Sequence, residues 1–200
     1  MKVREGIDTT PRGPADRTRR AIINAATGVL ARDSTASLGD VARAASVGRT
    51  TLHRYYPDRA TLVRALAEEA FHATELAIGA STLDEGPASD ALRRLLYEMI
   101  ALGDRFVFLL REPSLADDPQ VDAAEARTTA VICGLIARGQ SSGEFTSELP
   151  AAWIAEAVGS LVYGAWVAME SGTVPRADAA RFAAATLLGG ILTSDGSGAT

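Results

Sequence analysis

Residues 37–57 have the layout of two short helices joined by a tight turn. Ser37 and Asp40 match a capping box, in which the Ser side chain accepts a hydrogen bond from the amide three residues on and the Asp side chain bonds back to the Ser amide. The apolar residues that follow have the spacing of one buried helical face, and they are Leu38, Val41, Ala42 and Ala45. The next three residues supply a bend, with Val47 as its apolar plug. This segment predicts a helix-turn-helix.

The second helix is predicted to run from residue 48 or 49 to residue 56, because Pro57 pushes the residue before it out of the helical region. Leu52 and Tyr56 then lie on one side of the helix. The opposite side consists of Thr50 and Arg54, flanked by Thr51 and His53. Arg and Thr side chains can bond base edges, and His or Tyr can bond phosphate, so this face suits the major groove of DNA. An ordinary solvated helix surface is the alternative, but the capped start and the apolar turn favour a DNA reader.

Longer runs on both sides of this motif resemble the tetracycline-repressor (TetR) family of bacterial transcription regulators. Residues 18–38 resemble the first helix of the family, with the inward positions Ile22, Ala26, Val29 and Leu30. Residues 55–62 resemble the exit from its recognition helix, where Asp58 is placed to cap the next helix. In the family the start of that helix lies against a DNA phosphate. Arg59, where the family usually has Lys, is a candidate to clamp the same phosphate.

Three positions depart from the family pattern without breaking its geometry. Ser46, Gly48 and His53 stand where a Gly, a Ser or Thr, and a phosphate-contacting Tyr are common. The helix-turn-helix and the start of the next helix still provide the predicted DNA contacts, which are Ser37, Arg49, Thr50, Thr51, His53, Arg54, Tyr55 and Arg59.

The charge distribution agrees with an N-terminal DNA reader. Residues 1–64 contain twelve Lys and Arg against six Asp and Glu, whereas residues 65–200 contain eight against nineteen, so the net charge of −5 conceals a basic head. A basic surface attracts the phosphate backbone whatever the base sequence. Arg17, Arg19 and Arg20 are candidates for an arm over the minor groove or the backbone. Arg12 and the residues before it belong either to this arm or to a solubilising tail.

The helical periodicity continues to the C-terminal part, so the chain is predicted to be all-α. We expect an N-terminal three-helix helix-turn-helix domain followed by a helical ligand-binding and dimerisation domain. The expected boundaries are a disordered arm at 1–15, a DNA-binding domain at 16–62 with its helix-turn-helix at about 38–56, and the second domain at 63–200. The resemblance implies that the last two helices, at about 150–171 and 176–193, form a dimer.

Residues 151–169 are nineteen residues with the single charge Glu156, which is long enough for a membrane span. The many Ala and Gly residues, the internal charge and the lack of a basic flank favour a soluble helix that packs on its own domain and on a partner. A two-fold dimer also places two recognition helices about 34–36 Å apart on a palindrome. The predicted interface residues are Ala157, Ser160, Gly164, Ala168, Leu187, Leu188 and Ile191.

The family resemblance also implies a ligand pocket among the helices of the second domain. An apolar or amphipathic small molecule is expected, because the sequence has no Gly-rich phosphate loop and no convergent Arg pair. The candidate lining residues are Phe71, His72, Tyr97, Phe106, Phe108, Trp153, Tyr163 and Trp166, although most aromatics at helical spacing are ordinary core. Glu98 and Glu156 are candidates to hold a cationic ligand, against the alternative of surface polar contacts.

An enzyme is disfavoured, because the sequence has only two histidines and none of the common catalytic motifs. Asp117 and Asp118 sit in a predicted loop without further ligands, so no metal and no cofactor are expected. The single cysteine, Cys133, lies in an apolar helix and fits a reducing cytoplasm. We therefore expect a homodimeric, cytoplasmic regulator that leaves a palindromic double-stranded DNA operator when a small effector binds. A helical interaction module, or a small-molecule-binding protein without sequence-specific DNA binding, is the alternative.

Overall fold

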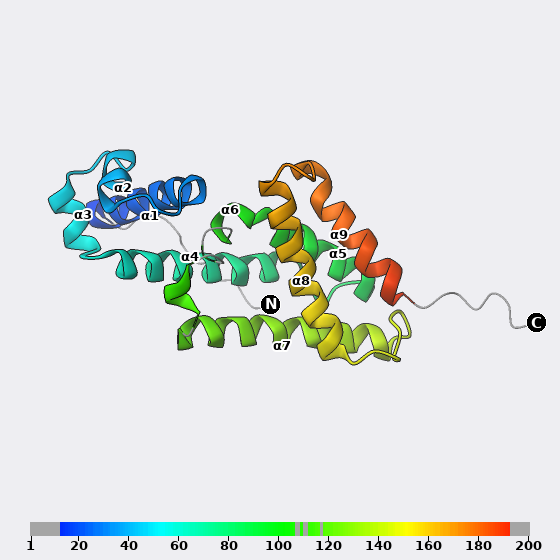
Figure 1. Cartoon of the computed structure of the whole chain (residues 1–200). Coiled ribbons are helices and arrows are strands. Elements are labelled where there is room, and N and C mark those ends of the chain that lie inside the picture. Colours follow the sequence, from blue (N-terminus) through cyan, green and yellow to red (C-terminus); the bar gives the residue numbers. More distant parts are fainter. Residues whose placement is uncertain (1–12, 107–108, 110–111, 117, 193–200) are drawn as a thin grey trace, which may run out of the picture. The chain divides into compact units, whose positions relative to one another are not determined.

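The computed structural model describes residues 13–106, 109, 112–116 and 118–192, and over these residues the protein is all-α (Figure 1). The chain forms two compact units that divide after Leu66. Helix α4, Arg59–Ala80, runs without interruption through this division. The division therefore falls after the second turn of α4, and the expected boundary after Leu62 lies one turn earlier.

The first unit contains α1 (Pro14–Arg32), α2 (Leu38–Ala44), α3 (Arg49–Tyr55) and the first two turns of α4. Its apolar centre consists of the fully buried side chains Ile22, Leu30, Val41, Leu52, Leu62 and Val63. The expected inward face of α1 is confirmed for Ile22, Ala26 and Leu30, whereas Val29 is half-buried. α1 begins at Pro14, earlier than expected, because proline suits the first position of a helix. Gly13 is the N-cap residue of α1, and residues 1–12 of the expected N-terminal arm lie outside the described residues.

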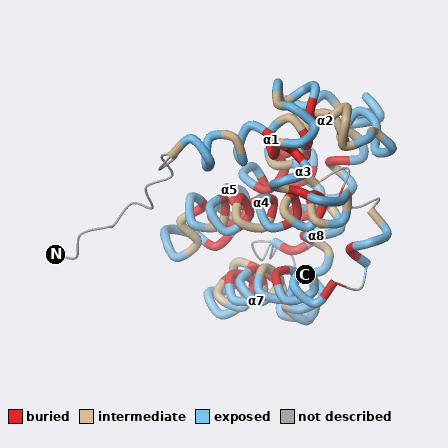
Figure 2. The backbone as a smooth tube through the Cα atoms, turned by 90° about the vertical axis from the view of Figure 1, so that its left-hand side faces the viewer, coloured by how far each residue is buried: buried red, intermediate tan, exposed pale blue. Residues whose placement is uncertain are grey.

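The second unit contains the rest of α4 and the elements α5 (Ala88–Ala101), α6 (Gly103–Phe106), η2 (Pro113–Leu115), α7 (Pro119–Ser141), α8 (Ala151–Glu170) and α9 (Arg176–Ile191). Helix α5 is at its centre and packs against α7, α8 and α9. Buried positions recur along α5 (Figure 2), and they include Ala88, Leu92, Leu95 and Leu96 with no exposed surface. The core is thus formed by the apolar stripes of these helices.

Three charged side chains hold the connection between α4 and α5. The Arg94 guanidinium donates to the carbonyl oxygens of Ser81, Thr82 and Glu85, at 2.8–2.9 Å. Arg138 donates to two more carbonyls of this connection. The Glu144 carboxylate accepts from the amides of Ala88 and Ser89, the first two residues of α5. The connection is thereby fixed from two helices and from the loop after α7.

Candidate DNA-binding surface and ligand cavity

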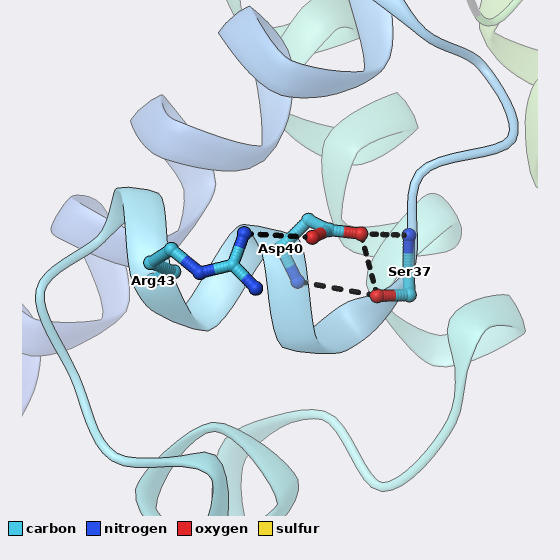
Figure 3. A network of polar contacts seen from close by, with 3 residues as sticks. All are labelled: Ser37, Asp40 and Arg43. Atoms are coloured by element: carbon cyan, nitrogen blue, oxygen red, sulfur yellow. Dashed lines mark hydrogen bonds and ion pairs between the residues drawn. The ribbon is translucent and has the colours of Figure 1, made fainter.

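The start of α2 has the hydrogen bonds of a capping box, as expected (Figure 3). The amide of Asp40 donates to Ser37 Oγ at 3.2 Å, and the amide of Ser37 donates to Asp40 Oδ2 at 3.0 Å. Arg43 donates to the other carboxylate oxygen of Asp40 at 3.0 Å. These bonds, first of all those from Ser37, hold the pKa of the Asp40 carboxyl below its usual value. The carboxylate therefore stays ionised and keeps α2 anchored.

The turn after α2 orients α3 so that the polar face of α3 is exposed to solvent. Ser46 has a φ of 55°, which is the left-handed conformation, and the amide of Val47 donates to Ala42 O at 3.0 Å. Leu52 and Tyr56 are 1% and 3% exposed, so they anchor α3 from the inside. The expected outer residues Arg49, Thr50, His53 and Arg54 are exposed, and Thr51 and Tyr55 are half-buried. The predicted reading face is therefore open to solvent.

Two of the predicted phosphate contacts have partners within the protein. His53 Nδ1 lies 3.2 Å from the carbonyl oxygen of Pro57. The Arg59 guanidinium donates to Ser34 O at 2.7 Å and to Ala36 O at 3.1 Å. Asp58, in contrast, has the expected capping geometry, because its Oδ1 accepts from the amide of Thr61 at 2.7 Å. The phosphate role of Arg59 stays a prediction, and its guanidinium is directed at the loop before α2.

The second unit contains a cavity of about 390 Å³. Its apolar walls come from α4, the end of α6, η2 with nearby residues, and the start of α7, and they are Ala67, Phe71, Phe106, Leu109, Pro113, Leu115, Ala116 and Val121. Three carboxylate residues complete the lining: Glu112, Asp122 and Glu125. Burial raises the pKa of the Glu125 carboxyl, and the nearby charges of Asp122 and Glu156 raise it further. The cavity thus combines aromatic walls with crowded negative charge.

The expected pocket residues divide into three groups. Phe71 and Phe106 line the cavity, and their rings meet edge to face with centroids 6.1 Å apart. Trp166 lies behind Phe106, stacked on it at 4.9 Å, and its Nε1 donates to Ile100 O. Outside the lining are His72, which lies 3.8 Å from Glu75, and the exposed Tyr97, Trp153 and Tyr163, while Phe108 is outside the described residues.

The carboxylates of the cavity were missed from sequence. Glu112 precedes η2, and Asp122 and Glu125 lie in the first two turns of α7, where acidic side chains are usually solvated. Asp118 is 8% exposed and accepts from the amide of Gln120 at 2.9 Å, so it caps α7. Asp117 lies outside the described residues. Across the described part of the chain, no group of three His, Cys, Asp or Glu side chains has the arrangement of a metal site.

The expected dimer residues divide into exposed or half-buried residues of α8 and buried residues of α9. Ser160 and Gly164 are exposed on α8, and Ala157 and Ala168 are half-buried. Leu187, Leu188 and Ile191 are 3–5% exposed and belong to the core of their own protomer, so their assignment to an interface needs correcting. Helix α9 is apolar on nearly all sides, and periodicity alone does not say which stripe faces inward. Its exposed side carries Phe182 instead, 42% exposed.

A basic, capped helix-turn-helix joined to a cavity-bearing helical unit defines the class of ligand-regulated DNA-binding proteins. No family model matches the sequence. The transcriptional repressor LfrR of Mycolicibacterium smegmatis is 36% identical over 181 residues, which cover 90% of this chain and 94% of the relative. The crystal structure of this TetR-like regulator in complex with proflavine has a TM-score of 0.76 and covers 91% of this chain and all of the other.

A second relative is the transcriptional regulator NfxB of Pseudomonas aeruginosa, 30% identical over 131 residues, or 64% of this chain and 70% of the relative. The chain belongs to the TetR family, and it is a helix-turn-helix transcriptional regulator. The expected family and the all-α fold are confirmed.

Proposed function

We propose that the protein is a dimeric repressor that leaves a palindromic operator when a small aromatic cation enters the cavity of the second unit. The observation that carries the effector class is the cavity lining, whose described residues include two aromatic rings and three carboxylates and no Lys, Arg or His. Flat rings pack on Phe side chains, and a cation gains further from their faces. The volume falls within the range of small-molecule sites.

The electrostatics of Glu125 support a cationic effector. Its pKa is raised because burial and the neighbouring carboxylates disfavour its charge. A bound cation would favour that charge, so binding is expected to release a proton at a pH near the raised pKa. LfrR, 36% identical, has been crystallised with proflavine, a flat aromatic cation. Proflavine is therefore the first effector to try.

The exposed side of α8 supports a dimer. By length and composition α8 could cross a membrane, and only 28% of its apolar window is buried. Trp153 is 64% exposed and Tyr163 is 49% exposed on this helix. Gly159 and Gly164 have open space where a Cβ would stand, so a second helix can approach the backbone closely. A second copy that covers α8 and the exposed side of α9 would bury these surfaces and pair two readers on one palindrome.

The DNA-binding part of the proposal is tested by selecting random duplex DNA with the purified protein and sequencing what is bound at two salt concentrations. A palindromic motif is expected. Arg54→Ala should weaken binding to that motif by about 1–3 kcal/mol and relax the preference at one base pair. Binding without a motif would overturn the operator proposal. Since bacterial operators lie in the cytoplasm, we place the protein there and assign it no catalytic role.

The effector part is tested on the operator found in this way. Proflavine should release the protein, with a 5- to 150-fold loss of operator affinity for a coupling of about 1–3 kcal/mol. Glu125→Gln should weaken proflavine binding, whereas Glu98→Gln, an exposed charge outside the lining, should not. Because protonation neutralises Glu125, proflavine affinity of the parent should fall as pH drops through the raised pKa. Equal affinities of the two variants would overturn the assignment of the cavity.

A further inference from the structure

Arg59 ties the first residue of α4 to a loop that lies 23–25 residues earlier in the chain. Its Nη2 donates to the carbonyl oxygen of Ser34 at 2.7 Å and its Nη1 to that of Ala36 at 3.1 Å. The two bonds come from different nitrogens of one planar group. A Lys ammonium is a compact charge without this fork, so it does not reproduce the pair.

The loop that receives these bonds determines where α2 begins. Asp33 accepts from the amide of Thr35 at 2.9 Å and from its hydroxyl at 2.6 Å, and the amide of Ala36 donates back to Asp33 O at 3.0 Å. The next residue is Ser37, which starts the capping box of α2. A guanidinium bonded to the carbonyl just before this cap therefore fixes the start of α2 to the start of α4.

The reading helix depends on the same arrangement. α2 packs against α3, and the Arg49 side chain at the first turn of α3 lies against Gly39, where a Cβ would stand 3.3 Å from its Nη2. A shift of the first turn of α2 would displace this Arg and with it the reading face. We infer that Arg59 is a positioning residue for DNA reading, which holds α2 and α3 in register with α4, and not a ligand of a DNA phosphate.

The inference rests on the proposed operator binding and makes a different prediction from a phosphate clamp. A clamp depends on positive charge, so Arg59→Lys would bind like the parent, and Arg59→Ala would lower the slope of log affinity against log salt by about 0.9. A positioning residue depends on the fork. Arg59→Lys is then as impaired as Arg59→Ala on the operator, by about tenfold, the size of one lost hydrogen bond from a charged donor. Neither substitution changes the salt slope or the affinity for random DNA.

Asp33→Ala provides a matched test from the opposite side of the loop. It removes both bonds to Thr35 and also makes the DNA-binding unit more positive. If charge alone determined operator affinity, this variant would bind the operator more tightly. The positioning account predicts a loss like that of Arg59→Lys, again confined to the operator. All variants are compared with the parent by fluorescence anisotropy well below their melting temperatures, with the folded state checked by circular dichroism.

The outcomes separate the inference from the proposed function. A parent that finds no operator contradicts the function itself. A parent that binds its operator, together with an Arg59→Lys variant of equal affinity or an Arg59→Ala variant with a reduced salt slope, overturns the positioning role. Variants that melt earlier but bind the operator normally overturn it too, because they reduce Arg59 to a contribution to stability. Operator-specific loss in both Arg59→Lys and Asp33→Ala supports it.

Discussion

At the scale of the residue, Ser46 is a side chain in a backbone conformation that favours glycine. Its φ of 55° lies in the left-handed region, which costs a residue with a Cβ about 1–2 kcal/mol. Gly costs the folded state about 0.5–1 kcal/mol of extra chain entropy. The balance favours glycine at this turn, in agreement with the glycine that is common here in the family. The chain therefore keeps a small strain between α2 and α3.

We expect Ser46→Gly to raise the free energy of unfolding by about 0.5–1 kcal/mol, which is the relief of strain less the entropy cost. Urea denaturation followed by circular dichroism measures it as a higher midpoint with an unchanged slope. Ser46→Ala is the control, because it removes the exposed hydroxyl but retains the Cβ, and it should bring no gain. If Gly and Ala variants have the same midpoint, the turn stores no relevant strain.

At the scale of the element, Glu144 acts as a cap that α5 takes from elsewhere in the chain. Pro87 precedes α5 and offers no side-chain cap. The Glu144 carboxylate instead accepts from the amides of Ala88 at 2.8 Å and Ser89 at 3.0 Å, and from the Ser89 hydroxyl at 2.9 Å. The Ser89 amide is the main cause that lowers the pKa of Glu144 to about 2. Negative charge at a helix start is also favoured by the helix dipole.

Glu144→Gln is expected to lower the free energy of unfolding by about 1–2 kcal/mol at pH 7, since an ionised acceptor is replaced by a neutral one and the site is partly open to solvent. The folded pKa lies below the unfolded one, so the carboxylate stabilises the fold above about pH 4.5 and ceases to do so as pH falls towards 2. Parent and variant should therefore converge in acid. Glu148→Gln, an exposed acid of the same loop, is the control. A constant difference across this pH range would contradict the role.

Local signals explain why some elements were predictable and others were not. The box of Ser37 and Asp40 and the stop at Pro57 act within a few residues, so α2 and α3 follow from sequence alone. The buried face of α9 could not be predicted in this way, because Ala, Leu and Gly residues of α9 occur around most of the helix. The helices that pack against α9 decide which of its faces is buried. The α5 cap is equally hidden, since Glu144 and Ser89 lie 55 residues apart.

At the scale of the whole molecule, the cavity arises from segments that are separated along the chain. Phe71 comes from α4, Phe106 from α6, and Glu125 from α7. Two of its aromatic walls could be named from sequence because they are large and apolar. Its carboxylates could not, because Asp and Glu side chains are usually exposed to solvent. The DNA-binding function could be inferred from the sequence of the helix-turn-helix, whereas the chemistry of the ligand could be inferred only from the folded cavity.

Assembly is the remaining property of the whole molecule, and Gly164 offers a clean test of it. Nothing lies within 4 Å of a Cβ built at Gly164 on α8, and the same holds for Gly134 on α7, so the protomer accommodates a side chain at both positions. Both are exposed helical glycines, and replacing either should raise helix stability by a similar amount. The two positions lie on different helices and therefore on different surfaces of the protomer. Gly164 lies on the α8 face proposed to meet a second copy, beside the exposed Tyr163.

We therefore expect Gly164→Leu to convert the dimer to monomer in sedimentation velocity, because the added side chain keeps the two α8 backbones apart. Operator affinity should fall by more than about tenfold, since a single recognition helix reads only one half-site. Gly134→Leu should remain a dimer and bind normally. A Gly164→Leu protein that sediments as a dimer and binds the operator as tightly as the Gly134→Leu protein would contradict this interface. The two copies would then associate through another face, and the large exposed side chains of α8 would need a different partner.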